Sequence, residues 1–305
     1  MRMKIGCATG ILLCAALLPV PAASQENGRG FVFYENFQGS ANTDGAIAKL
    51  DTTIGYNFNQ HFGWDVGIPI YFVNPSETTS STTGTGSTVG IGNLYSALRL
   101  RYPNPTVNFL SVFTVTAPTG DREKGLSTGH ATFDWTNYFN RTLYSTTLFA
   151  NIGIANTVSD TNFFLRPFTS KGFLGHFGGG AELSLNSYTG IGASAYAIVP
   201  SGEQTLVSRV VPAPSSTNSV GSPMGRGVGL GLRRGNREPQ PFETVSETTG
   251  ASDLAKDHGF SLWVSAYPSS AINLYIGYNR SVPYAFNTVF FGAGFNLGSL
   301  ARQLR

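Results

Sequence analysis

Histidines are the side chains of this chain best suited to acid–base or metal chemistry, and there are four of them. No two histidines or carboxylates stand at a spacing typical of metal ligands. A His-x-Ser pair, which a membrane-embedded phospholipase would need, does not occur, and His130 with Thr132 is the nearest approach to it. His61 falls in a predicted tight turn, and His176 and His258 are predicted near a solvated rim. The sequence therefore predicts no metal, no cofactor and no enzyme.

A second set of polar side chains is predicted to share the inner face of a series of strands. Its members are Lys49, Asp51, Asp65, Arg99, Arg101, Asp134, Glu182 and Tyr275. Charges of both signs inside a barrel usually pair with each other and support the structure. The alternative hypothesis is a narrow zwitterionic channel in which Arg99 and Arg101 set the electric field. The sequence leaves both interpretations open.

Four arginines stand close together in the segment GSPMGRGVGLGLRRGNR, which contains no carboxylate. They are Arg226, Arg233, Arg234 and Arg237. Glycine next to arginine can cradle phosphate, but no Gly-Lys-Ser/Thr follows, so a nucleotide site is not predicted. The arginines lie in a connection, 200–257, that is too long to be structureless without a function. It is interpreted as a mobile surface loop, as a contact with lipopolysaccharide phosphates, or as a segment that folds into a pore.

The stretch 46–72 shows which elements position these side chains. From Ala48 to Phe58, apolar residues alternate with polar ones, and after the turn NQH the alternation resumes from Phe62 to Phe72. A period of two places the apolar side chains on one face of an extended strand, whereas a helix would scatter them. Both strands exceed the usual length of about 5–6 residues and match a tilted strand that crosses a bilayer.

The same alternation predicts about 12 strands along the chain. They are 31–38, 46–58, 62–73, 90–102, 107–117, 131–140, 142–155, 172–185, 189–199, 258–267, 271–281 and 287–297. The strand at 107–117 is apolar on both faces, and Thr114 and Thr116 are predicted to face inward. Short and long connections alternate, with a single-residue turn predicted at Arg141. Such loops are typical of an outer-membrane barrel with periplasmic turns and external loops. The predicted fold is all-β, a single antiparallel up-and-down transmembrane β-barrel over residues 25–305.

The N-terminus has the charged, apolar and small-residue order of a secretory signal, predicted at residues 1–24. Cys7 and Cys14 both lie within it, so no disulfide is predicted in the mature chain. Without Arg2 and Lys4, 18 basic residues stand against 17 acidic residues. This balance argues against a nucleic-acid partner. The predicted location is the outer membrane of a Gram-negative bacterium.

Aromatic residues gather at the ends of the predicted strands. Tyr56, Phe58, Phe62, Trp64 and Tyr102 are predicted to form a lower aromatic girdle, and Phe72 part of an upper one. The final strand ends in GAGFNL, Gly292 to Leu297, which resembles the signal read by the barrel-insertion machinery. The expected partners are therefore the lipid bilayer, lipopolysaccharide, that machinery and a small-molecule solute.

Three segments in order resemble one family of channels. They are STVGIGNLYSALRLR at 87–101, APTGDREKGLSTGHATFD at 117–134 and GYNRSV at 277–282. The chain is similar here to the outer-membrane β-barrel channels of the meta-pathway of phenol degradation. The family usually has Gly-x-Gly-Asp where this chain has Gly90, Ile91, Gly92 and Asn93, so one lumen carboxylate is missing.

The resemblance implies a channel or transporter for small, aromatic or apolar compounds. Small or no conductance is expected, because twelve strands lie between the filled eight-stranded barrel and the open sixteen-stranded one. Two alternatives stay open: a barrel enzyme acting on lipid, and a structural or adhesive barrel without transport.

Overall fold

The computed structural model describes residues 12–13, 18–19, 29–42, 45–75, 88–120, 126–127, 129–158, 168–208 and 246–296. The predicted signal segment falls almost wholly outside these residues, and so do Arg226, Arg233, Arg234 and Arg237. Near the N-terminus, β1 (Leu12–Leu13) and β2 (Leu18–Pro19) pair with each other in a sheet of their own.

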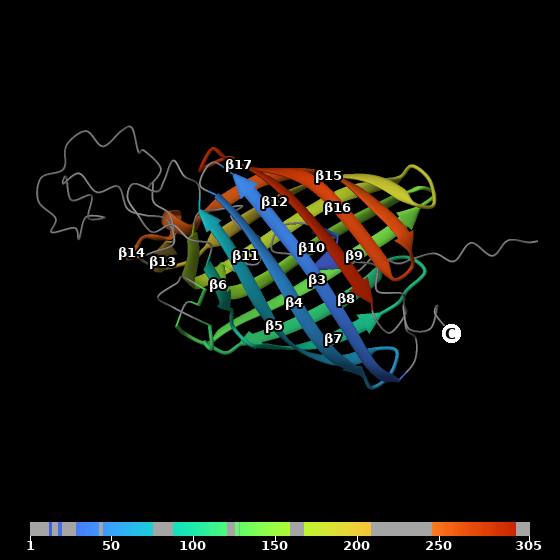
Figure 1. The fold of residues 1–305 in the computed structure, drawn as a ribbon, viewed down its shortest axis with the longest axis horizontal. Helices are drawn as coiled ribbons and strands as arrows, with labels where there is room; N and C mark the ends of the chain where they lie inside the picture. Colours follow the sequence, from blue (N-terminus) through green and yellow to red (C-terminus); the bar gives the residue numbers. More distant parts are fainter. Residues whose placement is uncertain are drawn as a thin grey trace, which may run out of the picture.

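Twelve long strands form one closed antiparallel barrel (Figure 1). In chain order they are β3 (Gly30–Asn42), β4 (Gly45–Asn57), β5 (Phe62–Pro75), β7 (Tyr95–Tyr102), β8 (Asn108–Thr116), β9 (Thr132–Leu143), β10 (Thr146–Val158), β11 (Phe168–Ser184), β12 (Thr189–Pro200), β15 (Asp257–Ser269), β16 (Ile272–Ser281) and β17 (Phe286–Asn296). Each strand pairs with the next in this series, and β17 pairs with β3 to complete the ring. The predicted up-and-down barrel is confirmed.

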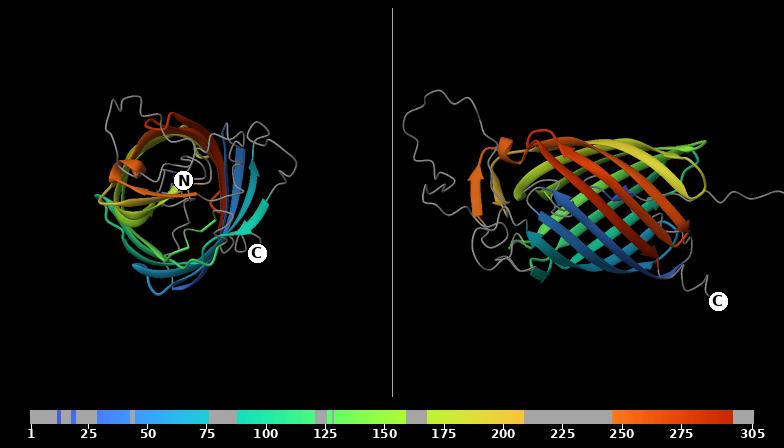
Figure 2. Two further views of the ribbon diagram at one scale, coloured as in Figure 1. Left: turned by 90° about the vertical axis from the view of Figure 1, so that its left-hand side faces the viewer. Right: turned by 45° about the horizontal axis from the view of Figure 1, so that its top comes forward.

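Short elements extend the barrel at the end where the long connections lie (Figure 2). β6 (Thr88–Ile91) pairs with β5, and β13 (Gln204–Ser208) pairs with both β11 and β14 (Ser246–Gly250). A 3-10 turn, η3 (Ser252–Ala255), follows. The connection predicted at 200–257 therefore starts and ends in paired strands. No helix in the described part of the chain is long and apolar enough to span a bilayer.

Side chains alternate between the two surfaces of the barrel as the sequence predicts. On β4 the outward Ile54 is 54% exposed, whereas its neighbour Thr53, which faces inward, is 8% exposed. On β8 the apolar Phe113 and Val115 are exposed and the threonines beside them are not, so the predicted orientation of this strand is confirmed. A barrel whose outer surface is apolar and whose backbone is paired all round meets the conditions for stability in hydrocarbon.

One carboxylate interrupts the apolar outer surface. Glu35 shares the outward face of β3 with Phe31 and Phe37, and it pairs across the strands with Thr52. The Thr52 hydroxyl lies 2.9 and 3.0 Å from the two carboxylate oxygens of Glu35. Because a carboxylate on a lipid-facing surface is costly, this hydrogen bond offsets part of the penalty.

The predicted lower girdle forms a chain of touching rings at the short-turn end. Tyr56 and Phe58 have ring centroids 5.2 Å apart, and Phe58 and Phe62 have centroids 5.3 Å apart. Trp64 donates its indole N–H to Ser96 at 2.7 Å, so the polar edge of this outward side chain is satisfied. Such rings suit the boundary between hydrocarbon and water.

The turn predicted at Arg141 is wrong. β9 continues to Leu143, and a two-residue turn, Tyr144–Ser145, connects it to β10. Tyr144 adopts a φ of 55°, which a tight hairpin needs and which the sequence does not signal with glycine or asparagine. The strand predicted at 90–102 is also divided, because pairing with β5 stops after Ile91 and resumes at Tyr95.

Replacing an outward residue by a charged one should test this orientation. We expect Ile54→Arg to lower the free energy of unfolding by about 2–4 kcal/mol, because it places a guanidinium in hydrocarbon. Asn36→Arg is the matched inward change, since Asn36 lies opposite Asp51 in the register. It should cost much less. The measurement is urea unfolding of the protein in lipid vesicles, and equal losses for the two variants would contradict the assigned faces.

Candidate functional site

A buried ion pair joins β5 to β7 inside the barrel. The Nε and Nη2 atoms of Arg99 lie 2.5 and 2.7 Å from the two carboxylate oxygens of Asp65. Nη2 also donates to Asn57 at 3.2 Å. Two parallel contacts to one carboxylate fix the guanidinium plane against the wall. For Arg99, this geometry favours the structural interpretation of the inner charges over the interpretation as a selectivity residue.

A second polar network lies on β4 and reaches β7. Lys49 and Asp51 form an ion pair at 3.2 Å. The Tyr95 hydroxyl donates to Asp51 at 3.0 Å and lies 2.6 Å from the Thr53 hydroxyl. Together with the Asp65–Arg99 pair, this network forms a charged wall, which we define as the inner faces of β4, β5 and β7. Arg101 extends it toward β3, where its guanidinium faces the Tyr34 side chain.

His176 lies inside the barrel, so its predicted place at a solvated rim is wrong. Its side chain is 9% exposed, and Nε2 lies 3.1 Å from Asp134 and 3.4 Å from the Thr136 hydroxyl. Thr136 also hydrogen-bonds to Asp134. The sequence placed His176 near the rim because the length of β11 was underestimated: the strand begins at Phe168.

This His–Asp–Thr cluster lacks the geometry of a catalytic triad. A triad uses one ring nitrogen of histidine for the nucleophile and the other for the orienting carboxylate. Here Asp134 and Thr136 both approach Nε2 of His176. The cluster can therefore hold the ring in place but cannot relay a proton between the two partners. Among the described residues, no group of three or more His, Cys, Asp or Glu side chains could hold a metal ion.

The structure also shows the surroundings of Glu182, of two further histidines and of Asn93. Glu182 accepts hydrogen bonds from Ser265 at 2.8 Å and from Tyr267 at 2.6 Å. His61 stacks on Tyr102 with ring centroids 6.1 Å apart, and His258 is exposed. Asn93, where the similar family has aspartate, accepts a hydrogen bond from the backbone N–H of Gly120 at 3.0 Å.

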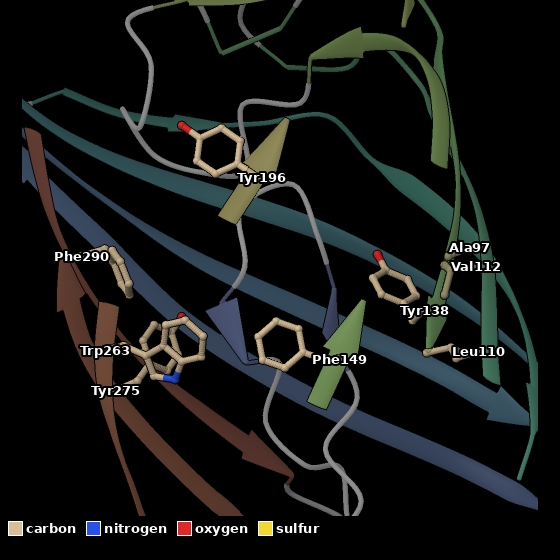
Figure 3. Packing of buried hydrophobic residues seen from close by; sticks show 9 residues of the cluster. All are labelled: Ala97, Leu110, Val112, Tyr138, Phe149, Tyr196, Trp263, Tyr275 and Phe290. Atoms are coloured by element: carbon tan, nitrogen blue, oxygen red, sulfur yellow. The ribbon is translucent and has the colours of Figure 1, made fainter. Parts of the chain in front are cut away.

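An aromatic cluster inside the barrel was not predicted from the sequence (Figure 3). Its members are Ala97, Leu110, Val112, Tyr138, Phe149, Tyr196, Trp263, Tyr275 and Phe290. Of these, Tyr275 belongs to the predicted inner set, and Leu110 and Val112 share the predicted inward face of their strand with Thr114 and Thr116. The Phe149 and Trp263 rings have centroids 6.1 Å apart, and the Tyr275 and Phe290 rings have centroids 6.3 Å apart. Both pairs have tilted geometry within the range of favourable ring contacts.

Four of the large rings of this cluster are each accommodated by a glycine on a neighbouring strand. Trp263 pairs in register with Gly192, and a Cβ placed on that glycine would lie 2.1 Å from the indole. The same holds for three other ring–glycine pairs: Phe149–Gly180, Tyr275–Gly292 and Phe290–Gly277. The glycine removes the side chain that would push the ring into the lumen, so each ring lies along the wall. The sequence signal for these pairs is a bulky residue at an inward-facing position of one strand and a glycine at the facing position of the next.

The charged wall and four large rings of the aromatic cluster come from different strands of the barrel. The charged side chains come from β4, β5 and β7, whereas Phe149, Trp263, Tyr275 and Phe290 come from β10, β15, β16 and β17. In the ring of twelve strands, β7 and β15 are six strands apart in either direction, and so are β3 and β10. These four rings define an aromatic wall. Its strand β15 lies opposite β7 of the charged wall, whereas its strand β17 is separated from β4 of the charged wall by β3 alone.

Two connecting segments fold into the long-loop end of the barrel. Leu126, which follows β8, is buried against Ile47, Tyr71 and Val73. Ala255 of η3 is buried in a separate cluster with Ala155, Leu174 and Ile198. Both segments therefore pack against buried side chains of the barrel at this end.

Comparison with solved structures found outer-membrane channels. The COG4313 outer membrane channel from Pseudomonas putida superposes with a TM-score of 0.50 at 11% identity, covering 92% of this chain and 97% of that chain. The KdgM porin in complex with disordered oligogalacturonate gives a TM-score of 0.47 at 8% identity, covering 86% of this chain and 98% of that one. The first likeness shows the fold. No family profile and no curated protein sequence matches the chain.

Removing one partner of the buried ion pair should destabilise the barrel. Arg99→Ala leaves the Asp65 carboxylate without its cation, and we expect a loss of about 3–5 kcal/mol in the free energy of unfolding. The double variant Arg99→Met, Asp65→Leu removes both charges and should lie close to the wild type. Urea unfolding in lipid vesicles measures both, and a single variant as stable as the double one would contradict the pairing.

Filling the glycine positions should push rings into the lumen. In Gly192→Ala and Gly292→Ala, the atoms nearest to the new methyl group belong to the side chains of Trp263 and Tyr275, respectively. We expect lower single-channel conductance, with a stability loss of about 1–3 kcal/mol. Gly179→Ala is the control, because its Cβ would make only ordinary contact with the Phe149 carbonyl oxygen at 3.4 Å. A conductance that stays at the wild-type value in both test variants would contradict the model of rings held flat by glycine.

Proposed function

We propose that this protein is a channel in the outer membrane of a Gram-negative bacterium and that it passes small aromatic or apolar compounds. The observation that carries the proposal is the aromatic wall inside a closed barrel whose outer surface is apolar. Aromatic rings bind apolar solutes by contact area and by the geometry of their π-systems. A barrel built only as a scaffold has no need for four large rings on its inner face.

The charged wall suits this function because it gives the lumen a second chemistry. Ion pairs and hydrogen bonds on β4, β5 and β7 keep that side of the passage polar. A solute with a ring and a polar substituent can face both walls at once. The sequence resemblance to channels of the phenol meta-pathway supports the same class of solute, and the solved neighbours are themselves described as a channel and a porin.

The competing functions have less support. An enzyme acting on lipid would need a nucleophile and a base on the outward face, and the one His–Asp–Thr cluster in the described residues faces inward with the wrong geometry. A structural or adhesive barrel would not require the two walls. We also propose that the outer girdle binds the bilayer and that the arginines at 226–237 contact lipopolysaccharide phosphates.

The proposal is tested with purified protein in planar lipid bilayers. We expect small ionic currents that phenol reduces in a saturable manner, because the solute occupies the same narrow passage. A ring-free alcohol of similar solubility, cyclohexanol, should block less well, since it cannot stack on the aromatic wall. A silent bilayer together with release of fatty acids from the lipid would overturn the channel and favour the enzyme.

A further inference from the structure

The three tryptophans of the chain differ in how their indole N–H groups are satisfied. The two outward ones have acceptors: Trp64 donates to Ser96 at 2.7 Å and Trp135 donates to Ser111 at 2.9 Å. The inner one, Trp263, is 4% exposed, and no residue in the described ranges accepts its N–H. A buried donor without an acceptor is costly, so this group calls for an explanation.

A second buried donor, the hydroxyl of Tyr275, lies in the same cluster (Figure 3). The Tyr275 ring is buried next to Phe290, with its hydroxyl over the Cα of Gly292. That hydroxyl faces the Gln38 side chain but makes no hydrogen bond of normal geometry within the described part of the barrel. The aromatic wall therefore carries two donors, from β15 and β16, whose hydrogen-bonding capacity is unused. On the charged wall, Asn57 Nδ2 and the Nε atoms of Arg99 and Arg101 also lack a hydrogen bond, but Arg99 Nε lies 2.5 Å from the Asp65 carboxylate.

We infer that Trp263 and Tyr275 form a binding subsite for aromatic solutes that carry a hydrogen-bond acceptor oxygen. The inference rests on the proposed channel function and narrows its class of solute. The solute's ring inserts beside Phe149 and Trp263, and its oxygen accepts from the indole N–H or the tyrosine hydroxyl. An aromatic ketone, ester or phenol satisfies both requirements, whereas a bare aromatic hydrocarbon leaves the donors unsatisfied.

Two probes and two donor deletions test the subsite in planar bilayers. Acetophenone has a ring and an acceptor oxygen, and ethylbenzene has the ring alone. Trp263→Phe and Tyr275→Phe remove one donor each and keep an aromatic ring. We expect each variant to raise the half-blocking concentration of acetophenone by about three- to tenfold, the worth of one hydrogen bond, and to leave that of ethylbenzene unchanged. Trp64→Phe makes the same substitution on the outer surface and should change neither value.

A fluorescence titration makes the test independent of current. The double variant Trp64→Phe, Trp135→Phe leaves Trp263 as the single tryptophan of the three in the chain. In vesicles, acetophenone should quench its emission saturably, and Tyr275→Phe in this background should shift the midpoint upward. Folding of every variant is checked by its heat-dependent migration in gel electrophoresis.

The outcomes separate the subsite from the channel. If a donor deletion weakens both probes equally, or neither, the subsite is wrong while the block itself still supports the channel. Unsaturable quenching of Trp263 also rules out the subsite. If the wild type passes no ions but quenching saturates with the expected shift, the subsite stands and the channel function fails.

Discussion

Every feature of this protein depends on the need to pair each backbone N–H and C=O of a sheet that lies in hydrocarbon. A flat sheet has two edges, and each edge strand would present unpaired groups to a solvent that offers no hydrogen bonds. The pairing of β17 with β3 removes both edges at once. Once the backbone is satisfied in this way, the outer side chains need only be apolar. Among the described strands, the one outward carboxylate in mid-strand, Glu35, is held by a hydroxyl on the adjacent strand.

Closure also creates an inner surface that must be stabilised without a conventional core. On one side the barrel meets this need with ion pairs, of which Asp65–Arg99 is the most constrained. On the other side it uses aromatic rings that pack against glycines and against each other. The aromatic wall retains two buried donors, the indole N–H of Trp263 and the Tyr275 hydroxyl, that the described residues do not engage.

The fold could be predicted from the sequence because its main signal is local. Side chains at successive positions of a strand point to opposite faces, so a period of two identifies both the strand and its lipid-facing side. All twelve strands of the barrel correspond to predicted ones. The errors concern one turn and one strand end, where the local sequence pattern gives no signal. Tyr144 lies in a tight turn without glycine or asparagine, and β11 begins several residues before its alternation is clear.

The inner surface was less predictable, because its contacts join residues far apart in the chain. The inward charges could be read from parity, but their partners could not: Arg99 and Asp65 are 34 residues apart, and His176 and Thr136 are 40 apart. The aromatic wall was missed for the same reason. The indole of Trp263 can lie along the wall because it packs over Gly192. That contact follows from the register of β12 and β15, which the sequence does not specify.

The pairing of rings with glycines has a consequence for how such a passage can change over evolutionary time. In most barrels the bore grows only when strands are added, which alters the circumference and every contact around it. Here the free cross-section is adjusted one facing pair at a time. Exchanging a single ring or its opposite glycine would widen, narrow or reshape the bore for a different solute. The number of strands and the lipid-facing surface of the barrel would stay as they are.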